Sequence, residues 1–153
     1  MIEEYSGQYI AVADLFHEAV HRTASSCYTP EQLEAWAPRP VDYERWRVRC
    51  ESKRPFLHRD GDSVLGFIEF EADGHIDCHY VHPDHNQMGI GSALLRHVIR
   101  IAGELRLPGL FVEASHVAKG LYLKHGFDVV RPNEVTLGDV TLQNWIMEKR
   151  LSS

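Results

Sequence analysis

The stretch Tyr80–Leu105, with the sequence YVHPDHNQMGIGSALLRHVIRIAGEL, decides how the rest of the chain is organised. It predicts the end of a strand, a short polar loop with glycines at positions 89 and 91, and then a long amphipathic helix. The apolar residues of that helix fall on one side: Ile90, Leu94, Leu95, Val98, Ile99, Ala102 and Leu105. Such a stripe indicates a helix that packs on a core.

The two glycines stand where this helix begins, and their position points to an anion site. The first turn of a helix leaves backbone N–H groups without intrahelical partners, and glycine removes the Cβ atoms that would keep an anion away. The loop therefore suits a phosphate or a pyrophosphate, although Gly-x-Gly before a helix is also a common tight turn. The chain has no Walker A sequence, and Leu94 stands where a dinucleotide fingerprint needs its third glycine.

Composition limits the classes of protein that fit. With 153 residues, the chain is expected to form one domain, residues 1–153. The net charge of −6 argues against a nucleic-acid partner. Cys27, Cys50 and Cys78 are scattered and odd in number, which favours reduced thiols over a disulfide framework or a CxxC metal site. Since no signal peptide and no membrane-length apolar run is visible, we expect a cytoplasmic protein without a membrane partner.

The remaining patterns predict an α/β protein with a mixed sheet. Helices are expected at Ile10–Ser25, from Pro30 to near Ala37 after a Thr29 cap, at Val41–Glu51 and at Val117–His125 before a closing Gly126. Strands are expected at Met1–Tyr5, Pro55–Arg59, Ser63–Glu71, His75–Val81, Gly109–Glu113, Phe127–Arg131 and Thr141–Glu148. The parallel part of the sheet should lie beside the central helix.

Two segments together resemble the signatures of a known family. The segment Asn86–Leu95, NQMGIGSALL, resembles the acyl-CoA-binding motif [Q/R]-x-x-G-x-[G/A] of the GCN5-related N-acetyltransferase (GNAT) superfamily. The segment Ala118–Phe127, AKGLYLKHGF, is similar to that family's second signature, A-x-x-L-Y-x-K-x-G-F. The resemblance implies the GNAT fold, a mostly antiparallel twisted sheet of about 6–7 strands with helices on both faces. The N-terminal half, with Ala35-Trp36-Ala37, resembles a poorly characterised bacterial subgroup.

The resemblance implies an enzyme that transfers the acetyl group of acetyl-CoA, its cosubstrate, to a primary amine by direct attack in a ternary complex, with no metal. Backbone amides from Met88 to Ser92 would hold the pyrophosphate, and the strand edge at Tyr80–Val81 would pair with the pantetheine arm. Asn86 departs from the usual Gln or Arg, and Ser115 from the usual Asn. The predicted cofactor-binding residues are Tyr80, Val81, Asn86, Gln87, Met88, Gly89, Ile90, Gly91, Ser92, Ser115, Lys119 and Tyr122.

Two proton transfers call for catalytic residues. A protonated amine must lose a proton before it attacks, and Asp77 and Glu69 are the predicted general bases, ahead of His79. Strand alternation places Asp77 and His79 on one face. Tyr122 stands where the family commonly has its general acid, and a phenol is protonated at pH 7. Other roles stay open for all four residues: a solvated strand position for Glu69, a structural hydrogen bond for Asp77, a packed or capped ring for His79 and a core aromatic for Tyr122.

The acceptor, a small-molecule or protein amine, is expected to lie against Tyr28, Trp36 and Trp46 of the N-terminal helices. The other interpretation is that the two tryptophans only pack these helices on the sheet. A homodimer that exchanges strands within Val135–Glu148 also stays open.

Two rival functions follow from the same features. A non-catalytic module that binds acyl-CoA as a sensor or regulator would keep the glycine loop without needing an acid or a base. A metal site at His79, His82 and His85 with Asp84 is disfavoured, because His79 and His82 are three apart on a strand and so face opposite ways.

Overall fold

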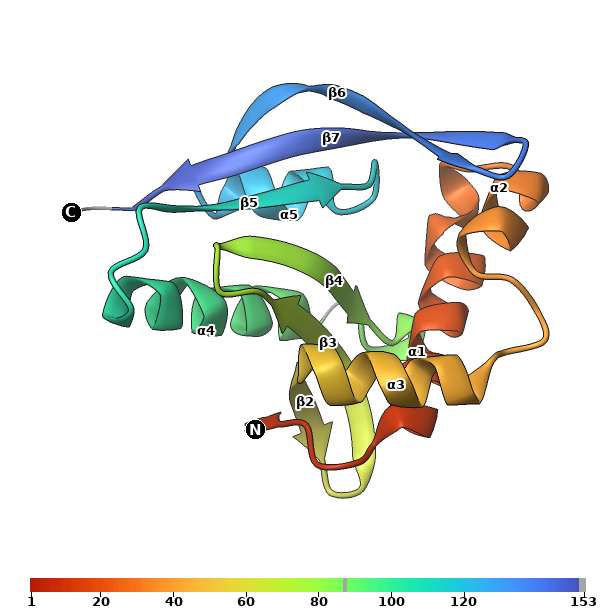
Figure 1. Ribbon diagram of the computed structural model, residues 1–153, viewed down its shortest axis with the longest axis horizontal. Coiled ribbons are helices and arrows are strands. Elements are labelled where there is room, and N and C mark those ends of the chain that lie inside the picture. Colours follow the sequence, from red (N-terminus) through yellow and green to blue (C-terminus); the bar gives the residue numbers. More distant parts are fainter. Residues whose placement is uncertain (87, 152–153) are drawn as a thin grey trace.

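The computed structural model describes residues 1–86 and 88–151, and these form a seven-stranded sheet in the order β1-β2-β3-β4-β5-β7-β6 (Figure 1). All neighbouring strands are antiparallel except β4 and β5, which confirms the predicted mostly antiparallel sheet. The strands are β1 (Ile2–Glu4), β2 (Phe56–Asp60), β3 (Ser63–Phe70), β4 (His75–Val81), β5 (Gly109–Ala114), β6 (Asp128–Leu137) and β7 (Val140–Arg150).

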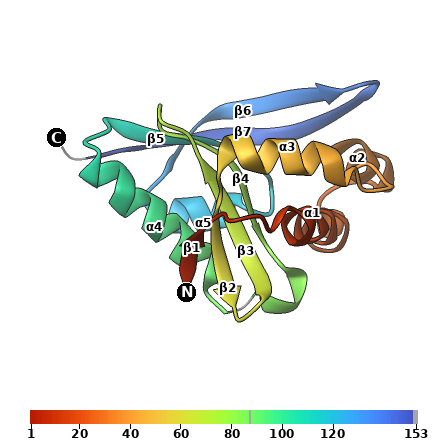
Figure 2. The same ribbon diagram turned by 60° about the horizontal axis from the view of Figure 1, so that its bottom comes forward.

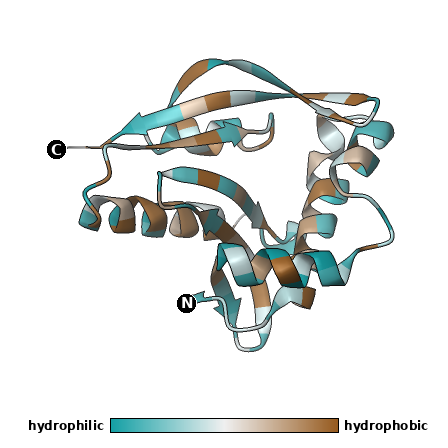
Figure 3. Cartoon of the chain, viewed as in Figure 1, coloured by the Kyte–Doolittle hydropathy of each residue, from teal (hydrophilic) through white to brown (hydrophobic). Residues whose placement is uncertain are grey.

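Helices cover both faces of the sheet, as predicted (Figure 2). The helices α1 (Tyr9–Glu18), α2 (Pro30–Trp36) and α3 (Tyr43–Lys53) lie on one face, and α4 (Ile90–Glu104) and α5 (Lys119–Lys124) lie on the other. Hydrophobic and hydrophilic residues alternate along α4, which is the pattern of a helix with one buried side (Figure 3). The side chains of Leu94, Leu95 and Val98 are fully buried, and burying each contributes about 1.5–3 kcal/mol.

The helix predicted at Ile10–Ser25 is not one regular α-helix. The α-helical turns end at Glu18, a π-helical turn follows at Ala19–Thr23, and a 3-10 turn follows at Ala24–Ser26. The apolar periodicity does not reveal this change, because a π turn adds only one residue. The predicted start of α2 is confirmed: Thr29 accepts a hydrogen bond from the amide of Gln32 at 3.2 Å.

Strand β6 is longer than the segment Phe127–Arg131 that the sequence predicts. Pro132 and Asn133 ordinarily end a strand, but here both pair with β7. Because β6 lies at the edge of the sheet, the missing N–H of Pro132 breaks no pairing with a further strand. Within the described residues, none of the helices has the length and apolar character needed to cross a membrane.

The sheet opens between its two parallel strands. Strand β4 pairs with β5 only at His75 and Ile76, opposite Phe111 and Val112. Beyond these pairs the two strands separate, as Figure 1 shows. The C-terminal half of β4 therefore leaves an open backbone edge toward β5, directly before the chain turns into α4.

A bulge in β4 corrects one prediction. Ile68 of β3 pairs with His79, and Phe70 pairs with Ile76, so two steps along β3 match three along β4. The extra residue of β4 breaks the alternation of its side chains. Asp77 bonds to α3, whereas His79 bonds to α4 and α5, so the prediction that they share one face is wrong.

Candidate active site

A cavity of 390 Å³ lies beside the open edge of β4 and the start of α4. The π-helical turn forms one wall of it through Ala19, Val20 and Thr23. The predicted cofactor-binding residues that line this cavity are Tyr80, Val81, Asn86, Gly89, Gly91, Ser92 and Ser115. The lining residues do not include Met88, Ile90 or Lys119; Tyr122 lines a second cavity, and Gln87 lies outside the described residues.

The first turn of α4 has the features of an anion site. Gly89 precedes the helix in the left-handed conformation, with φ of 74°, and the space where its Cβ would stand is open. Within the described part of the chain, no side chain caps this helix, so its first amides face outward with the positive end of the helix dipole. The amide of Met88, predicted to join them, instead donates to the carbonyl of His85 at 3.3 Å. The turn fits a phosphate group.

Polar contacts tie the loop before α4 to the π-helical turn. The side-chain amide of Asn86 donates to Oγ1 of Thr23 at 3.2 Å, and Arg22 pairs with Asp84 at 2.8 Å. Asn86, which departs from the family motif, is therefore used to hold the loop against the N-terminal half of the chain. These contacts join two walls of the 390 Å³ cavity.

A second cavity, of 430 Å³, lies on the other side of β4. Tyr28 and Trp36 line it, as predicted, but Trp46 does not. Trp46 packs in the core, with its ring centroid 4.9 Å from that of Phe16. The lining residues that sequence reasoning missed come from segments far apart in the chain: Phe16, Arg49, Glu113, Asn144 and the hairpin residues Val135, Leu137 and Leu142.

Hydrogen bonds fix the aromatic wall of this second cavity. The hydroxyl of Tyr28 donates to the carbonyl of Gln143 at 2.8 Å and accepts from the amide of His116 at 3.1 Å. The indole N–H of Trp36 donates to the hydroxyl oxygen of Tyr80 at 3.1 Å. The rings are therefore held in place by the same polar atoms that burial would otherwise leave unsatisfied.

The two predicted general bases are held in ion pairs. Arg49 donates to both carboxylate oxygens of Glu69, at 2.9 and 2.6 Å, and to Asp77 at 2.9 Å, and Lys53 donates to Asp77 at 3.0 Å. Glu69 is fully buried and lines neither cavity, whereas Asp77 lines the second one. Burial raises the pKa of Asp77, but Lys53 and Arg49 outweigh this and lower it, so the carboxylate is ionised.

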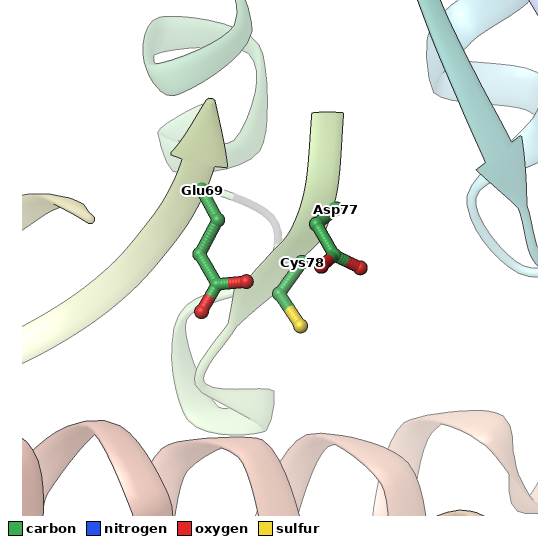
Figure 4. A group of neighbouring side chains, drawn as sticks. All are labelled: Glu69, Asp77 and Cys78. Carbon is green, nitrogen blue, oxygen red and sulfur yellow. The ribbon is translucent and has the colours of Figure 1, made fainter. Parts of the chain in front are cut away.

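Glu69, Asp77 and Cys78 lie side by side, with ligand atoms within 4.8 Å of one another (Figure 4). Nη2 of Arg49 bonds to both carboxylates and lies 3.3 Å from Sγ of Cys78, so a side-chain cation already stands among the three. Burial also raises the pKa of the Cys78 thiol well above its usual value, which disfavours the thiolate that a metal would need.

Tyr122, which is buried, and His79, which is half-buried, form a hydrogen-bonded pair. The hydroxyl of Tyr122 lies 2.8 Å from Nδ1 of His79, and Nε2 of His79 lies 3.0 Å from the carbonyl oxygen of Gly91. Because a carbonyl oxygen only accepts, Nε2 carries the imidazole proton and Nδ1 accepts from Tyr122. Burial lowers the pKa of His79 to about 4, against the hydrogen bond to Gly91, so the ring is neutral at pH 7.

The two cavities share part of their walls. The residues that line both are Trp36, His79, Tyr80, Ser115 and Ala118. Tyr122 lines the second cavity close to this shared wall, since its hydroxyl bonds to His79. Two ligands, one in each cavity, would therefore meet next to the Tyr122–His79 pair.

The chain resembles known proteins in sequence and in fold. A family model described as an acetyltransferase (GNAT) domain matches residues 24–149. The uncharacterized N-acetyltransferase YafP of Escherichia coli (strain K12) is 30% identical over 141 residues, which cover 92% of this chain and 89% of YafP. The crystal structure of a GCN5-related N-acetyltransferase from Rhodopseudomonas palustris has a TM-score of 0.91 at 28% identity, covering 99% of this chain and 95% of that one. YncA of Salmonella typhimurium, solved with acetyl-CoA, has a TM-score of 0.76 at 21% identity, covering 100% of this chain and 94% of that one.

Proposed function

The chain belongs to the GNAT acetyltransferase family and is an acetyl-CoA-dependent N-acetyltransferase, and we propose that it acetylates the primary amine of a small molecule with an apolar or aromatic body. The transfer would be a direct attack of the amine on the thioester in a ternary complex. One observation carries this proposal: the 390 Å³ and 430 Å³ cavities meet at a shared wall beside Tyr122. Direct attack requires the two reacting groups to be held in contact, and a shared wall provides the place.

Acetyl-CoA is assigned to the 390 Å³ cavity. The pyrophosphate would lie on the outward-facing amides at the start of α4, beside Gly89 and Gly91. The pantetheine arm would run along the unpaired edge of β4 toward Tyr80, adding to the sheet where β5 has moved away. The relative YncA was solved with acetyl-CoA, which supports the choice of cosubstrate.

The acceptor amine is assigned to the 430 Å³ cavity. The rings of Phe16, Tyr28 and Trp36 offer an apolar surface for the body of the amine. The carboxylate of Asp77, on the same cavity wall, would attract its ammonium group. A cavity of this volume suits a small molecule, and the hairpin residues that cover one side leave less room for a folded protein.

Tyr122 is proposed as the general acid that protonates the sulfur of the leaving CoA. Burial raises the pKa of its phenol above the usual value, so the hydroxyl keeps its proton until the thiolate develops. The general-base roles of Asp77 and Glu69 stay predictions. Their ion pairs with Arg49 favour a role in holding α3 against the sheet, and only Asp77 of the two reaches the acceptor cavity.

A free-CoA release assay tests the proposal. The protein, acetyl-CoA and single members of an amine panel would be incubated together, with aromatic monoamines, linear polyamines and lysine peptides as separate classes. We expect release above the background rate for amines with an aromatic or apolar body. If acetyl-CoA stabilises the protein against heat but no amine releases CoA, the non-catalytic acyl-CoA-binding module is the better account.

A further inference from the structure

His79 is a half-buried histidine that the proposed function does not use. It stands between two elements of the site: Nδ1 faces the hydroxyl of Tyr122 on α5, and Nε2 faces the carbonyl of Gly91 in the first turn of α4. The hydrogen bond to Gly91 fixes the ring and decides its tautomer, because only Nε2 can then carry the proton. The lone pair of Nδ1 is thereby aimed at Tyr122.

This arrangement fixes the direction of the Tyr122 hydroxyl. Its single proton is directed to His79, and Tyr122 lines the acceptor cavity. The oxygen therefore has lone pairs, and no donor, to offer to a further partner. A phenol held in this way is ready to accept a proton from a group in the cavity. It is not yet oriented to donate one to sulfur.

From this geometry we propose that His79 and Tyr122 form a proton relay for the acetyl transfer. Tyr122 accepts the proton of the attacking amine while its own hydroxyl proton moves to Nδ1 of His79. Tyr122 then gives a proton to the sulfur of the leaving CoA, and His79 returns its proton to Tyr122. The relay rests on the proposed function, and it supplies a base for the proton that the nitrogen loses as it attacks the thioester. Tyr122 touches the reacting groups, whereas His79 acts through Tyr122 and is a positioning residue that also holds the proton.

The relay balances the reaction. The ammonium group first loses one proton to solvent water. The neutral amine then forms the new C–N bond, and the second nitrogen proton passes to the oxygen of Tyr122 as the tyrosine proton passes to His79. When the C–S bond breaks, its electron pair stays on sulfur, which takes the proton from Tyr122 while His79 returns the stored one. The products are the amide and the free thiol of CoA, with no net exchange of protons with the enzyme.

The surroundings of the pair suit a short-lived proton store. A buried tyrosinate is avoided, because the oxygen of Tyr122 gains one proton as it loses the other. In the charged state both nitrogens of His79 donate, to Gly91 and to Tyr122, so neither proton is left without a partner. Burial keeps the pKa of His79 low, so the imidazolium returns its proton readily. The relay also leaves Asp77 and Glu69 in their ion pairs with Arg49.

The test compares His79→Asn, Tyr122→Phe and the double variant in the CoA-release assay. Asparagine keeps an acceptor oxygen near the position of Nδ1 but cannot store a proton. We expect each single variant to lower kcat about 100-fold or more, with the KM for acetyl-CoA within about threefold of wild type. The double variant should be no slower than the slower single variant, since both remove one relay. His97→Asn, a partly exposed histidine outside both cavities, is the matched control and should keep wild-type kcat.

Nitrogen NMR of the His79 ring gives a readout that does not depend on turnover. We expect a neutral ring with the proton on Nε2 between pH 6 and 8, and a shift of the Nδ1 signal in Tyr122→Phe. A proton on Nδ1, or a kcat of His79→Asn within threefold of wild type, would overturn the relay and leave the proposed function standing. If His79→Asn does not fold, His79→Gln takes its place under the same criteria. Absence of amine turnover by the wild-type protein would instead reject the proposed function, and the relay with it.

Discussion

The indole N–H of Trp36 donates to the hydroxyl oxygen of Tyr80 at 3.1 Å, and this bond joins α2 to β4 where the two cavities share a wall. The residues are 44 positions apart in the chain. A helix that carries one wall of the acceptor cavity is thus fixed to the strand that would hold the pantetheine arm. The hydrogen bond gives a first way to test the assignment of that cavity.

Replacing Trp36 by Phe keeps an apolar ring but removes the N–H donor. We expect the KM for the amine to rise about fivefold, since a lost hydrogen bond costs about 1 kcal/mol, while kcat stays within about threefold. Trp46→Phe is the matched control, because Trp46 packs in the core outside the cavity. Steady-state kinetics at saturating acetyl-CoA measure both variants. If Trp36→Phe and Trp46→Phe change the KM for the amine equally, Trp36 is not part of the acceptor site.

Replacing Tyr122 by Phe should lower kcat more than it raises the KM for acetyl-CoA. The expected loss in kcat is about 10²–10⁴-fold, the usual contribution of a positioned acid or base. Tyr43→Phe removes an exposed hydroxyl that bonds to Asp14 and should leave the kinetics unchanged. A Tyr122→Phe enzyme with wild-type kcat would show that this tyrosine is only a core aromatic.

Replacing Gly89 by Ala should weaken acetyl-CoA binding. Alanine at the φ of 74° that Gly89 adopts costs about 1–2 kcal/mol, so the loop before α4 would be strained or would move. Gly61→Ala, at φ of 60° in the turn between β2 and β3, imposes a similar strain far from the site. We expect calorimetry to show weaker acetyl-CoA binding only for the Gly89 variant, although both lower the melting temperature. If Gly89→Ala and Gly61→Ala bind acetyl-CoA with the same affinity, this would argue against the pyrophosphate site at α4.

Replacing Asp77 by Asn separates two roles of this carboxylate. As an attractor of the ammonium group, Asp77 should affect mainly the KM of the amine, with a rise of about 5–10-fold for about 1 kcal/mol of lost attraction. As the general base, it should affect mainly kcat, by a factor of about 100 or more. The geometry favours the first result, because Arg49 and Lys53 stabilise the ionised carboxylate. A large loss of kcat with an unchanged KM would restore the base role and contradict the relay.

His75 should make stability depend on pH. Its ring bonds to Glu71 and Glu113, each at 2.6 Å, where β4 and β5 still pair. Burial lowers the pKa of His75, but the two carboxylates outweigh this and raise it. The stabilisation is therefore complete below the unfolded pKa of about 6.5 and is lost as pH rises through the folded pKa. His79 and other histidines whose pKa is lowered act in the opposite direction, so the test is the difference between two proteins. From pH 6 to pH 8, the free energy of unfolding measured with denaturant should fall more, or rise less, in wild type than in His75→Gln. If the free energy of unfolding depends on pH equally in both proteins, His75 is not stabilised by Glu71 and Glu113 in this way.

Local patterns predicted the elements around the 390 Å³ cavity. The glycines at 89 and 91, the apolar stripe of α4 and the Thr29 cap each act within a few residues, so the sequence shows them directly. Together with the segment Ala118–Phe127 they led to the family and to most of the 390 Å³ cavity. Val81, Gly91 and Ser115, three of the predicted cofactor-binding residues, line it.

The acceptor side was harder to predict because it depends on contacts between distant segments. The bulge in β4 adds one residue, and nothing in the alternation of HIDCHYV marks it. Because of that extra residue, Asp77 contacts α3 and His79 contacts Tyr122. The histidine ranked last among the candidate bases is therefore the hydrogen-bond partner of Tyr122. Trp46 and Trp36 look equally suited to bind a ligand, and only the packing of α3 on Phe16 distinguishes them.

The central claim is that an amine in one cavity attacks acetyl-CoA in the other without a covalent enzyme intermediate. Mass spectrometry of a single turnover, with enzyme in excess over acetyl-CoA, tests this most directly. We expect the N-acetyl amine and free CoA to appear together in equal amounts, and no acetylated protein before the amine is added. Acetylated protein that forms first and then transfers its group would contradict direct attack. Bound acetyl-CoA that persists unchanged with every amine would contradict the acetyltransferase account itself.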